Sequence, residues 1–282
     1  MRLLKELSTF KIGGPARFVA EAKTVEEMSS LLKGAYPNNV VVIGKGSNCL
    51  FSDQGFNGLV VLNKIDFMTP VSDTVTVGAG FSFALLGSRT ARAGFSGLEF
   101  ASGIPASVGG AIFMNAGANG QETADTLMSV DFLNEKGELF TFLKKDLNFS
   151  YRHSSFQGMK GAIVAATFGL TKNLLAREKQ LKIIEYRQKT QPYGEPSIGC
   201  IFRNPVGDCC LSAAALIDQA GLKKTAVGGA EVSEKHANFI INPSGSATAA
   251  DVEGLIKMIK EKVFAHAGIL LEEEIRKITF EG

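Results

Sequence analysis

The chain has 282 residues, of which 45% are hydrophobic and 21% are charged, an ordinary composition for a folded globular protein. Thirty basic and 28 acidic side chains leave a formal charge of +2 and form no long run of one sign. This pattern disfavours a nucleic-acid partner. No stretch has the apolar length of a membrane span or a signal peptide, so we expect a cytoplasmic protein that needs no membrane.

The numbers and positions of cysteines and glycines indicate what kinds of site the protein can contain. The four cysteines, at positions 49, 200, 209 and 210, show neither a Cys-x-x-Cys spacing nor a paired histidine. We therefore expect no metal site and no disulfide framework. Glycine stands out with 31 residues against eight prolines, which indicates many tight turns and close approach of main chain to a large ligand.

The first seventy residues have the pattern of a small α/β unit. A helix is expected from a capping pattern at Thr24 to a stop at Gly34. Two β-branched runs, at 40–43 and 58–62, predict buried strands, and the glycine-rich segment 44–48 lies between them.

The middle of the chain is mixed and rich in strands. The expected elements are a strand at 74–77, a helix at 82–93, a hairpin of 129–133 and 138–142 around 134–137, and a strand at 163–168. Residues 173–190 are expected to form a connector helix. It should end there because the proline at 192 disfavours helical conformation in the residue before it.

The last hundred residues predict a third, α+β domain. A short helix is expected from Ser212 to Gly221, and a longer one from Thr248 to Gly268 with apolar residues along one face. The expected domains are 1–70, 71–190 and 191–274, with the tail 275–282 joining the first of them.

Two glycine-rich segments are candidates for ligand binding. In 44–48, consecutive backbone amides after a strand can converge on an anion, with Ser47 and Asn48 as further donors; a plain structural turn is the alternative. The segment 103–117 is a loop almost without charge, suited to contact a pyrophosphate and a flat ring through its amides, or else to a tightly packed crossover. No Walker or GxGxxG motif occurs.

These segments, in this order, resemble the FAD-binding segments of the UDP-N-acetylenolpyruvoylglucosamine reductase family. Further collinear motifs extend the resemblance over essentially the whole chain. They lie at 8–16 (STFKIGGPA), 149–156 (FSYRHSSF), 199–205 (GCIFRNP), 215–222 (ALIDQAGL), 228–238 (GGAEVSEKHAN) and 271–276 (LEEEIR).

The resemblance implies a vanillyl-alcohol-oxidase/PCMH-type α+β fold of two FAD-binding subdomains plus a substrate-binding domain. It also implies that NADPH reduces bound FAD, and that a hydride then passes from flavin N5 to the enolpyruvyl methylene of UDP-N-acetylglucosamine enolpyruvate. No obligate protein partner is implied. The residues implied to bind FAD are Gly44, Lys45, Gly46, Ser47, Asn48, Gly103, Ile104, Ser107, Gly109, Gly110, Asn115 and Ile163.

Three residues are implied to be catalytic. Arg152 would polarise the substrate carboxylate, Cys200 would protonate the carbon next to it, and Glu274 would act as a donor or orient Arg152 or water. Tyr151, Arg203, Asn204 and His236 would contact the UDP-sugar. By residue type alone, each also suits a structural role: an ion pair for Arg152, a buried apolar position for Cys200, and a solvated acidic run for 272–274.

Two departures from the family pattern affect the site. Many members carry serine at the position of Cys200, and the interval after Arg152 is too short for the tyrosine-bearing loop of longer members, so the chain resembles the shorter subtype. Two other functions stay open: a flavoprotein of the same fold acting on an alcohol or sugar, and a flavin- or nucleotide-sugar-binding protein without chemistry.

Overall fold

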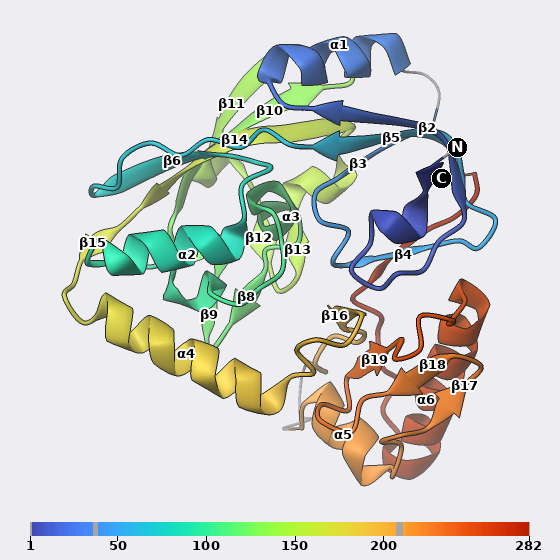
Figure 1. Cartoon of the computed structure of the whole chain (residues 1–282). Helices are drawn as coiled ribbons and strands as arrows, with labels where there is room; N and C mark the ends of the chain where they lie inside the picture. The colour runs from blue at the N-terminus through green and yellow to red at the C-terminus, as the bar shows by residue number, and fades with distance from the viewer. Residues whose placement is uncertain (1, 36–38, 207–210, 282) are drawn as a thin grey trace. The chain divides into compact units, whose positions relative to one another are not determined.

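The computed structural model describes residues 2–35, 39–206 and 211–281, and Figure 1 shows its elements. The backbone divides into two compact units. Unit 1 comprises Met1–Phe18, Gly46–Gly58 and Gln188–Gly282, and unit 2 comprises Val19–Lys45 and Leu59–Arg187. Strands β2 (Pro15–Ala22) and β5 (Phe56–Asn63) and helix α4 (Ala176–Thr190) run from one unit into the other.

Unit 2 is built on an antiparallel sheet of strands β11 (Leu139–Leu143), β10 (Leu127–Asn134), β14 (Gly161–Gly169) and β6 (Thr74–Gly78), in that order. Helix α1 (Val25–Ala35) covers one face through Met28 and Leu32, and α2 (Phe83–Arg92) and α3 (Val108–Phe113) lie on the other face (Figure 1). Its further elements are β3 (Val40–Ile43), β7 (Phe95–Ser96), β8 (Gly117–Ala118), β9 (Gln121–Glu122), β12 (Phe149–Ser150), β13 (His153–Ser154) and β15 (Thr171–Lys172).

The elements expected in the middle of the chain are confirmed. Strands β10 and β11 pair from Ser129↔Leu143 to Leu133↔Leu139, and Gly137, with φ +70°, closes their turn. The expectation that 103–117 is a loop throughout is wrong, because α3 lies inside it. Glycine disfavours helix, but Val108, Ala111 and Ile112 are fully buried, and their burial outweighs that cost.

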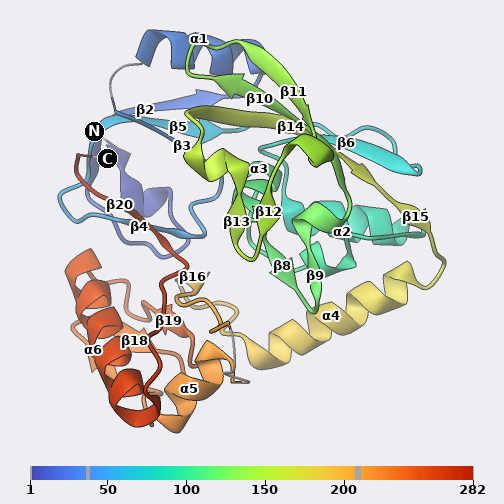
Figure 2. The same ribbon diagram turned by 180° about the vertical axis from the view of Figure 1, so that it is seen from behind.

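The elements of unit 1 are β1 (Arg2–Leu3), β4 (Cys49–Phe51), β16 (Ser197–Cys200), α5 (Ala213–Gln219), β17 (Ala226–Val227), β18 (Ala230–Val232), β19 (Phe239–Ile241), α6 (Ala249–Ala267) and β20 (Arg276–Ile278). They include a second antiparallel sheet of strand order β16-β19-β18-β17 and the parallel pair β20–β4. Figure 2 shows helices α5 and α6 beside the sheet.

Both helices expected in the last hundred residues are confirmed, and their caps explain their bounds. The Ser212 hydroxyl accepts a hydrogen bond from the Ala215 amide at the start of α5. Thr248 and Asp251 form a reciprocal capping box at the start of α6, and Gly268, with φ +69°, ends it in the left-handed conformation.

The core of unit 1 draws on three separate parts of the chain. Phe10 and Leu50 pack with Phe202, Leu255 and other residues of the last hundred. The three-domain division expected from the sequence stays a prediction. In the part of the chain that the structure describes, no helix has the length and apolar character needed to cross a membrane.

Candidate functional site

Cys200 lies at the end of β16, beside an irregularity in the strand. Ser197 pairs with Ile241 and Cys200 with Phe239, so β16 contains one residue more than its partner over this interval. Gly199, with φ +81°, takes up the extra residue as a bulge. Ile198 and Ile201 are buried, whereas Cys200 stays half-buried. The bulge thus turns the thiol away from a core position.

Glu274 lies on the segment that pairs with the residues after Cys200. The Glu274 amide donates to the Ile201 carbonyl at 2.8 Å, and the Arg203 amide donates to the Glu272 carbonyl at 2.8 Å. The Asn48 side chain donates to the Glu274 carbonyl at 3.3 Å. Backbone pairing therefore brings Cys200, Arg203, Glu274 and Asn48, all in unit 1, to neighbouring positions.

The three consecutive glutamates have different surroundings. Glu273 accepts from Lys260 at 2.6 Å and pairs with Lys277 at 2.9 Å. Burial would raise the pKa of Glu273, but the hydrogen bonds and charges of these two lysines together lower it. Glu272 is exposed and Glu274 is half-buried. Glu273 is thus held in a structural ion-pair network.

The other substrate-binding candidates of unit 1 are held by their neighbours to different degrees. The Nε atom of Arg203 is buried and has no hydrogen-bond partner among the described residues. The Asn204 side chain accepts from the Ala213 amide at the start of α5. The His236 ring packs edge-on against Phe239, with centroids 4.8 Å apart. Since Phe239 pairs with Cys200, His236 belongs to the same neighbourhood.

Arg152 and Tyr151 belong to unit 2, where they form the tip of the β12–β13 hairpin. Arg152 has φ +56°, a left-handed conformation that costs a residue with a side chain about 1–3 kcal/mol. Its Nη2 donates to the Gly117 carbonyl at 3.2 Å, and its guanidinium carbon lies 4.8 Å from the centre of the Tyr151 ring. Such local strain is typical of functional sites.

Within unit 2, Gly44 meets Ser107 at the start of α3, and Lys45 meets Ser82 at the start of α2. A Cβ atom at Gly44 would lie 1.9 Å from the Ser107 hydroxyl, so only glycine fits there. The Lys45 ammonium donates to the Ser82 hydroxyl at 2.8 Å and makes no salt bridge among the described residues. Burial, followed by the charge of Lys64, lowers the pKa of Lys45. An anion here would compensate the charge.

The remaining members of the two glycine segments differ in accessibility. Gly46 is buried in unit 1 against the Leu7 carbonyl, while Ser47 is half-buried in the same unit. In unit 2, Gly103 and Ile104 are half-buried, and Gly110 is exposed. The Gly109 amide donates to the Ala79 carbonyl, the Gly103 carbonyl accepts from Arg187, and Asn115 is fully buried. Outside these segments, the Ile163 carbonyl accepts from Asn63.

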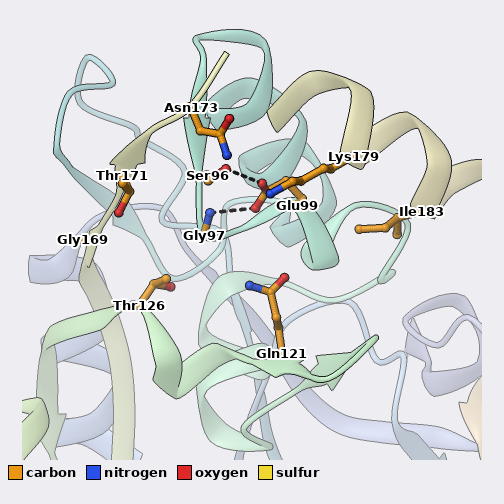
Figure 3. A pocket seen from close by; sticks show the side chains of 10 residues that line it. All are labelled: Ser96, Gly97, Glu99, Gln121, Thr126, Gly169, Thr171, Asn173, Lys179 and Ile183. Carbon is orange, nitrogen blue, oxygen red and sulfur yellow. Dashed lines mark hydrogen bonds between the residues drawn. The ribbon is translucent and has the colours of Figure 1, made fainter. Parts of the chain in front are cut away.

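A cavity of about 360 Å³ lies elsewhere in unit 2 (Figure 3). Buried Glu99 accepts there from the Ser96 hydroxyl and the Gly97 amide, both at 2.7 Å, while Gln121 and Lys179 contribute further polar groups. None of the site residues expected from the sequence lines this cavity. Among the described residues no cluster of three or more histidine, cysteine or acidic side chains could hold a metal.

Sequence reasoning did not identify two residues that hold candidate site groups. Ser82 accepts the hydrogen bond of Lys45, and Gln157 bonds to the backbone of Arg152. Neither belongs to a pattern with a chemical meaning of its own, since serine and glutamine are common turn and surface residues. Only the folded geometry identifies them.

Residues 16–143 match the family model of an FAD-binding domain. The chain is thus a flavoprotein with FAD as its cofactor. Residues 191–278 match the C-terminal domain of UDP-N-acetylenolpyruvoylglucosamine reductase. These two matches confirm the expected α+β flavoprotein fold with an added C-terminal domain.

Relatives cover nearly the whole chain. The UDP-N-acetylenolpyruvoylglucosamine reductase of Protochlamydia amoebophila is 58% identical, covering 99% of this chain and 93% of the relative. That of Chlamydia muridarum is 50% identical with the same coverage. The crystal structure of the reductase from Thermus caldophilus has a TM-score of 0.84 at 36% identity, covering 98% of this chain and 97% of that one. The chain belongs to the UDP-N-acetylenolpyruvoylglucosamine reductase family and is an oxidoreductase.

The residues of unit 2 fit the flavin dinucleotide. Gly110 is exposed, and a Cβ atom there would meet only the Ser107 hydroxyl within 4 Å, so main chain is open to a flat ligand. Lys45 supplies a cation that makes no salt bridge within the described ranges, and a pyrophosphate could accept a hydrogen bond from it. Both residues lie within the range that matches the FAD-binding domain.

Proposed function

We propose that this chain catalyses the NADPH-driven reduction of UDP-N-acetylglucosamine enolpyruvate to UDP-N-acetylmuramate, in the cytoplasmic synthesis of peptidoglycan precursors. The observation that carries the proposal is the similarity, over nearly the whole chain, to UDP-N-acetylenolpyruvoylglucosamine reductases, with 58% identity to that of Protochlamydia amoebophila. The C-terminal match at 191–278 disfavours an alcohol or sugar oxidase, which would not need that domain.

When bound, FAD supplies the redox chemistry, by accepting a hydride from NADPH and returning it to the methylene carbon of the enolpyruvyl group. Negative charge then develops on the neighbouring carbon and its carboxylate. The guanidinium of Arg152, which stays protonated at any physiological pH, is suited to bind that carboxylate. Its hydrogen bond to Gly117 and its position over Tyr151 support a fixed orientation for this task.

Cys200 is proposed to deliver the proton that the neighbouring carbon needs. A free thiol has a pKa of about 8.5, so most of it is protonated at pH 7 and available as an acid. The bulge at Gly199, which leaves Cys200 half-buried, supports access of a substrate to the thiol. Glu274, held next to Ile201 by backbone pairing, would orient the substrate or donate to it.

The UDP-sugar is proposed to contact Tyr151, Arg203, Asn204 and His236. The buried Nε of Arg203, which lacks a partner among the described residues, supports this role because an anionic or carbonyl oxygen would satisfy it. The Asn204 side chain accepts from the Ala213 amide at the start of α5, which holds this residue next to Arg203.

The absorbance spectrum of the purified protein tests the proposal directly. We expect a yellow protein whose flavin absorption is bleached by NADPH and restored by UDP-N-acetylglucosamine enolpyruvate. Steady oxidation of NADPH should require that sugar nucleotide. A colourless protein, or a flavin that NADPH does not reduce, would overturn the proposal. Reoxidation by simple alcohols or sugars instead would favour the alternative flavoprotein function.

A further inference from the structure

Gln157 bonds directly to the backbone of Arg152. Its side-chain nitrogen donates to the Arg152 carbonyl at 3.1 Å and to the Phe113 carbonyl at 2.9 Å. One amide group thus joins the arginine turn to the last residue of α3. We propose that Gln157 is a positioning residue that holds Arg152 in the conformation needed for the reaction. The catalytic relevance of this contact rests on the function proposed above for Arg152.

The turn needs an external restraint because of its residue types. Tyr151 and Arg152 are the two central residues between Ser150 and His153, which pair across the hairpin. The second central residue has positive φ, a place where glycine or asparagine is preferred. An arginine there is disfavoured unless its surroundings hold it. Two side-chain N–H groups on one planar amide, directed at two carbonyls, provide that restraint.

A second amide side chain supports the other end of the turn. Asn115 is fully buried, and its nitrogen donates to the Ser150 carbonyl at 3.0 Å. Its oxygen accepts from the Ala124 amide at 3.0 Å, so this residue is itself fixed in place. The carbonyls of Ser150 and Arg152, one on each side of Tyr151, are thus both bound by amides next to α3.

The backbone conformation decides where the guanidinium lies. With Arg152 left-handed, its Nη2 reaches the Gly117 carbonyl and its guanidinium stacks over the Tyr151 ring. Relaxation of the backbone to negative φ would turn the side chain in a different direction. A misplacement of about 1 Å can reduce the rate of a reaction on the order of a hundredfold. Gln157 therefore acts on the reaction through the position of Arg152.

Limited proteolysis tests the positioning without reference to activity. An arginine-specific endoproteinase, which does not cleave after lysine, cuts where the backbone can adapt to the protease, so a restrained Arg152 should be cleaved slowly in the flavin-loaded protein. Gln157→Glu has nearly the same shape, but its carboxylate cannot donate to the two carbonyls. We expect cleavage after Arg152 to rise about tenfold relative to cleavage after exposed Arg92 in the same chain.

Two variants control this experiment. Gln157→Lys keeps donors at similar reach and should cleave at close to the native rate, whereas Gln54→Glu makes the same chemical change at an exposed position and should have no effect. Gln157→Leu, which removes the donors without adding charge, replaces the Glu variant if that variant fails to fold. Unchanged cleavage in the donor-free variants, or an equal rise in Gln157→Lys, would overturn the positioning role.

Kinetics then separate this inference from the function on which it rests. In Gln157→Glu we expect kcat to fall about tenfold or more, while the rate of flavin reduction by NADPH and the KM for NADPH stay unchanged. Gln157→Lys should recover most of the lost kcat. If cleavage after Arg152 rises while turnover with UDP-N-acetylglucosamine enolpyruvate stays native, the turn is held by Gln157, but Arg152 does not act on the substrate. That result would overturn its proposed catalytic role.

Discussion

The bulge at Gly199 decides which side of β16 Cys200 occupies. Without the bulge at Gly199, strand alternation would set Cys200 on the same side as Ile198, which is buried. The extra residue frees the thiol from that constraint. Replacing serine by cysteine at such a position keeps a small donor and changes its acidity, since a thiol is by far the stronger acid.

Variants of Cys200 test the proton transfer. Cys200→Ala should leave flavin reduction by NADPH at its native rate and slow reoxidation by the sugar nucleotide about a hundredfold or more, because no acid remains at that position. Cys200→Ser should keep much of the activity. Stopped-flow absorbance measures the two half-reactions separately. Native reoxidation in the Ala variant would exclude Cys200 as the donor.

The thiol of Cys49 is a weaker acid than an ordinary cysteine thiol. The residue lies half-buried in β4, and desolvation by the surrounding protein raises the pKa of its thiol to about 11 in spite of the Arg276 charge. At pH 8 only about one thiol in a thousand is then ionised, and the thiolate is the reactive form. We expect iodoacetamide to leave Cys49 unmodified in the native protein and to label it in urea, as peptide mass spectrometry would detect. Equal labelling in both states would contradict this.

At the level of single residues, the sequence predicted site chemistry only through the family motifs. No sequence spacing links Cys200 to Glu274 or to Asn48. These residues become neighbours only through backbone pairing between distant segments, and Arg152 lies in the other unit. The ion pairs of Glu273 likewise come from Lys260 and Lys277, four and more residues away. Their roles in the reaction stay predictions.

Helices with capping residues and hairpins with a glycine turn were the elements that local sequence could predict. The hairpin around 134–137 and helix α6 were confirmed close to their expected bounds because their signals are local. Strand β2 and helix α3 were missed. The short helix contains Gly109 and Gly110 and is stabilised by burial against the sheet, a tertiary effect that propensity cannot show.

Glu273 links helix α6 to strand β20 and makes that link depend on pH. Its pKa is lowered in the folded protein from an ordinary value of 4.5, so its charge stabilises the fold above about pH 4.5, and this contribution is lost as pH falls further. Glu273→Gln should cost about 1 kcal/mol at pH 7, as expected for a small partly exposed ion-pair network. The difference from the native protein should shrink at pH 3.5.

Urea unfolding at the two pH values measures this effect, and Glu253→Gln is the matched control. Glu253 is exposed and pairs with Lys277 at the longer distance of 3.7 Å, so its replacement should cost less at pH 7. A cost of Glu273→Gln that grew on acidification would mean that the carboxylate is not stabilised by its lysines.

On the scale of the whole chain, the two units are not consecutive segments. The chain passes between them after residues 18, 45, 58 and 187. Unit 1 is completed by its first residues, since the Thr9 hydroxyl donates to the Ser197 carbonyl at 2.7 Å and Asn242 donates to the Phe10 carbonyl at 3.1 Å. Sequence patterns identify elements in order along the chain, so they give no sign that early residues complete a late core.

This shared core predicts that unit 1 depends on the N-terminal segment for its stability. Phe10 is fully buried among residues of the last hundred, and Phe10→Ala should cost about 3–5 kcal/mol through lost burial and a cavity. Phe18→Ala is the control, because that ring is 58% exposed and should cost less than about 1 kcal/mol.

Guanidinium unfolding gives the two free energies, and amide hydrogen exchange locates the loss. In Phe10→Ala we expect faster exchange in α6 and β19, which belong to the same core, and native exchange in β10 and β14 of unit 2. By the same reasoning, a fragment of residues 188–282 lacks Phe10, Ile12 and Leu50 and should not unfold cooperatively on its own. A fragment with the stability of the full chain would show that the last hundred residues form their core without help from the first.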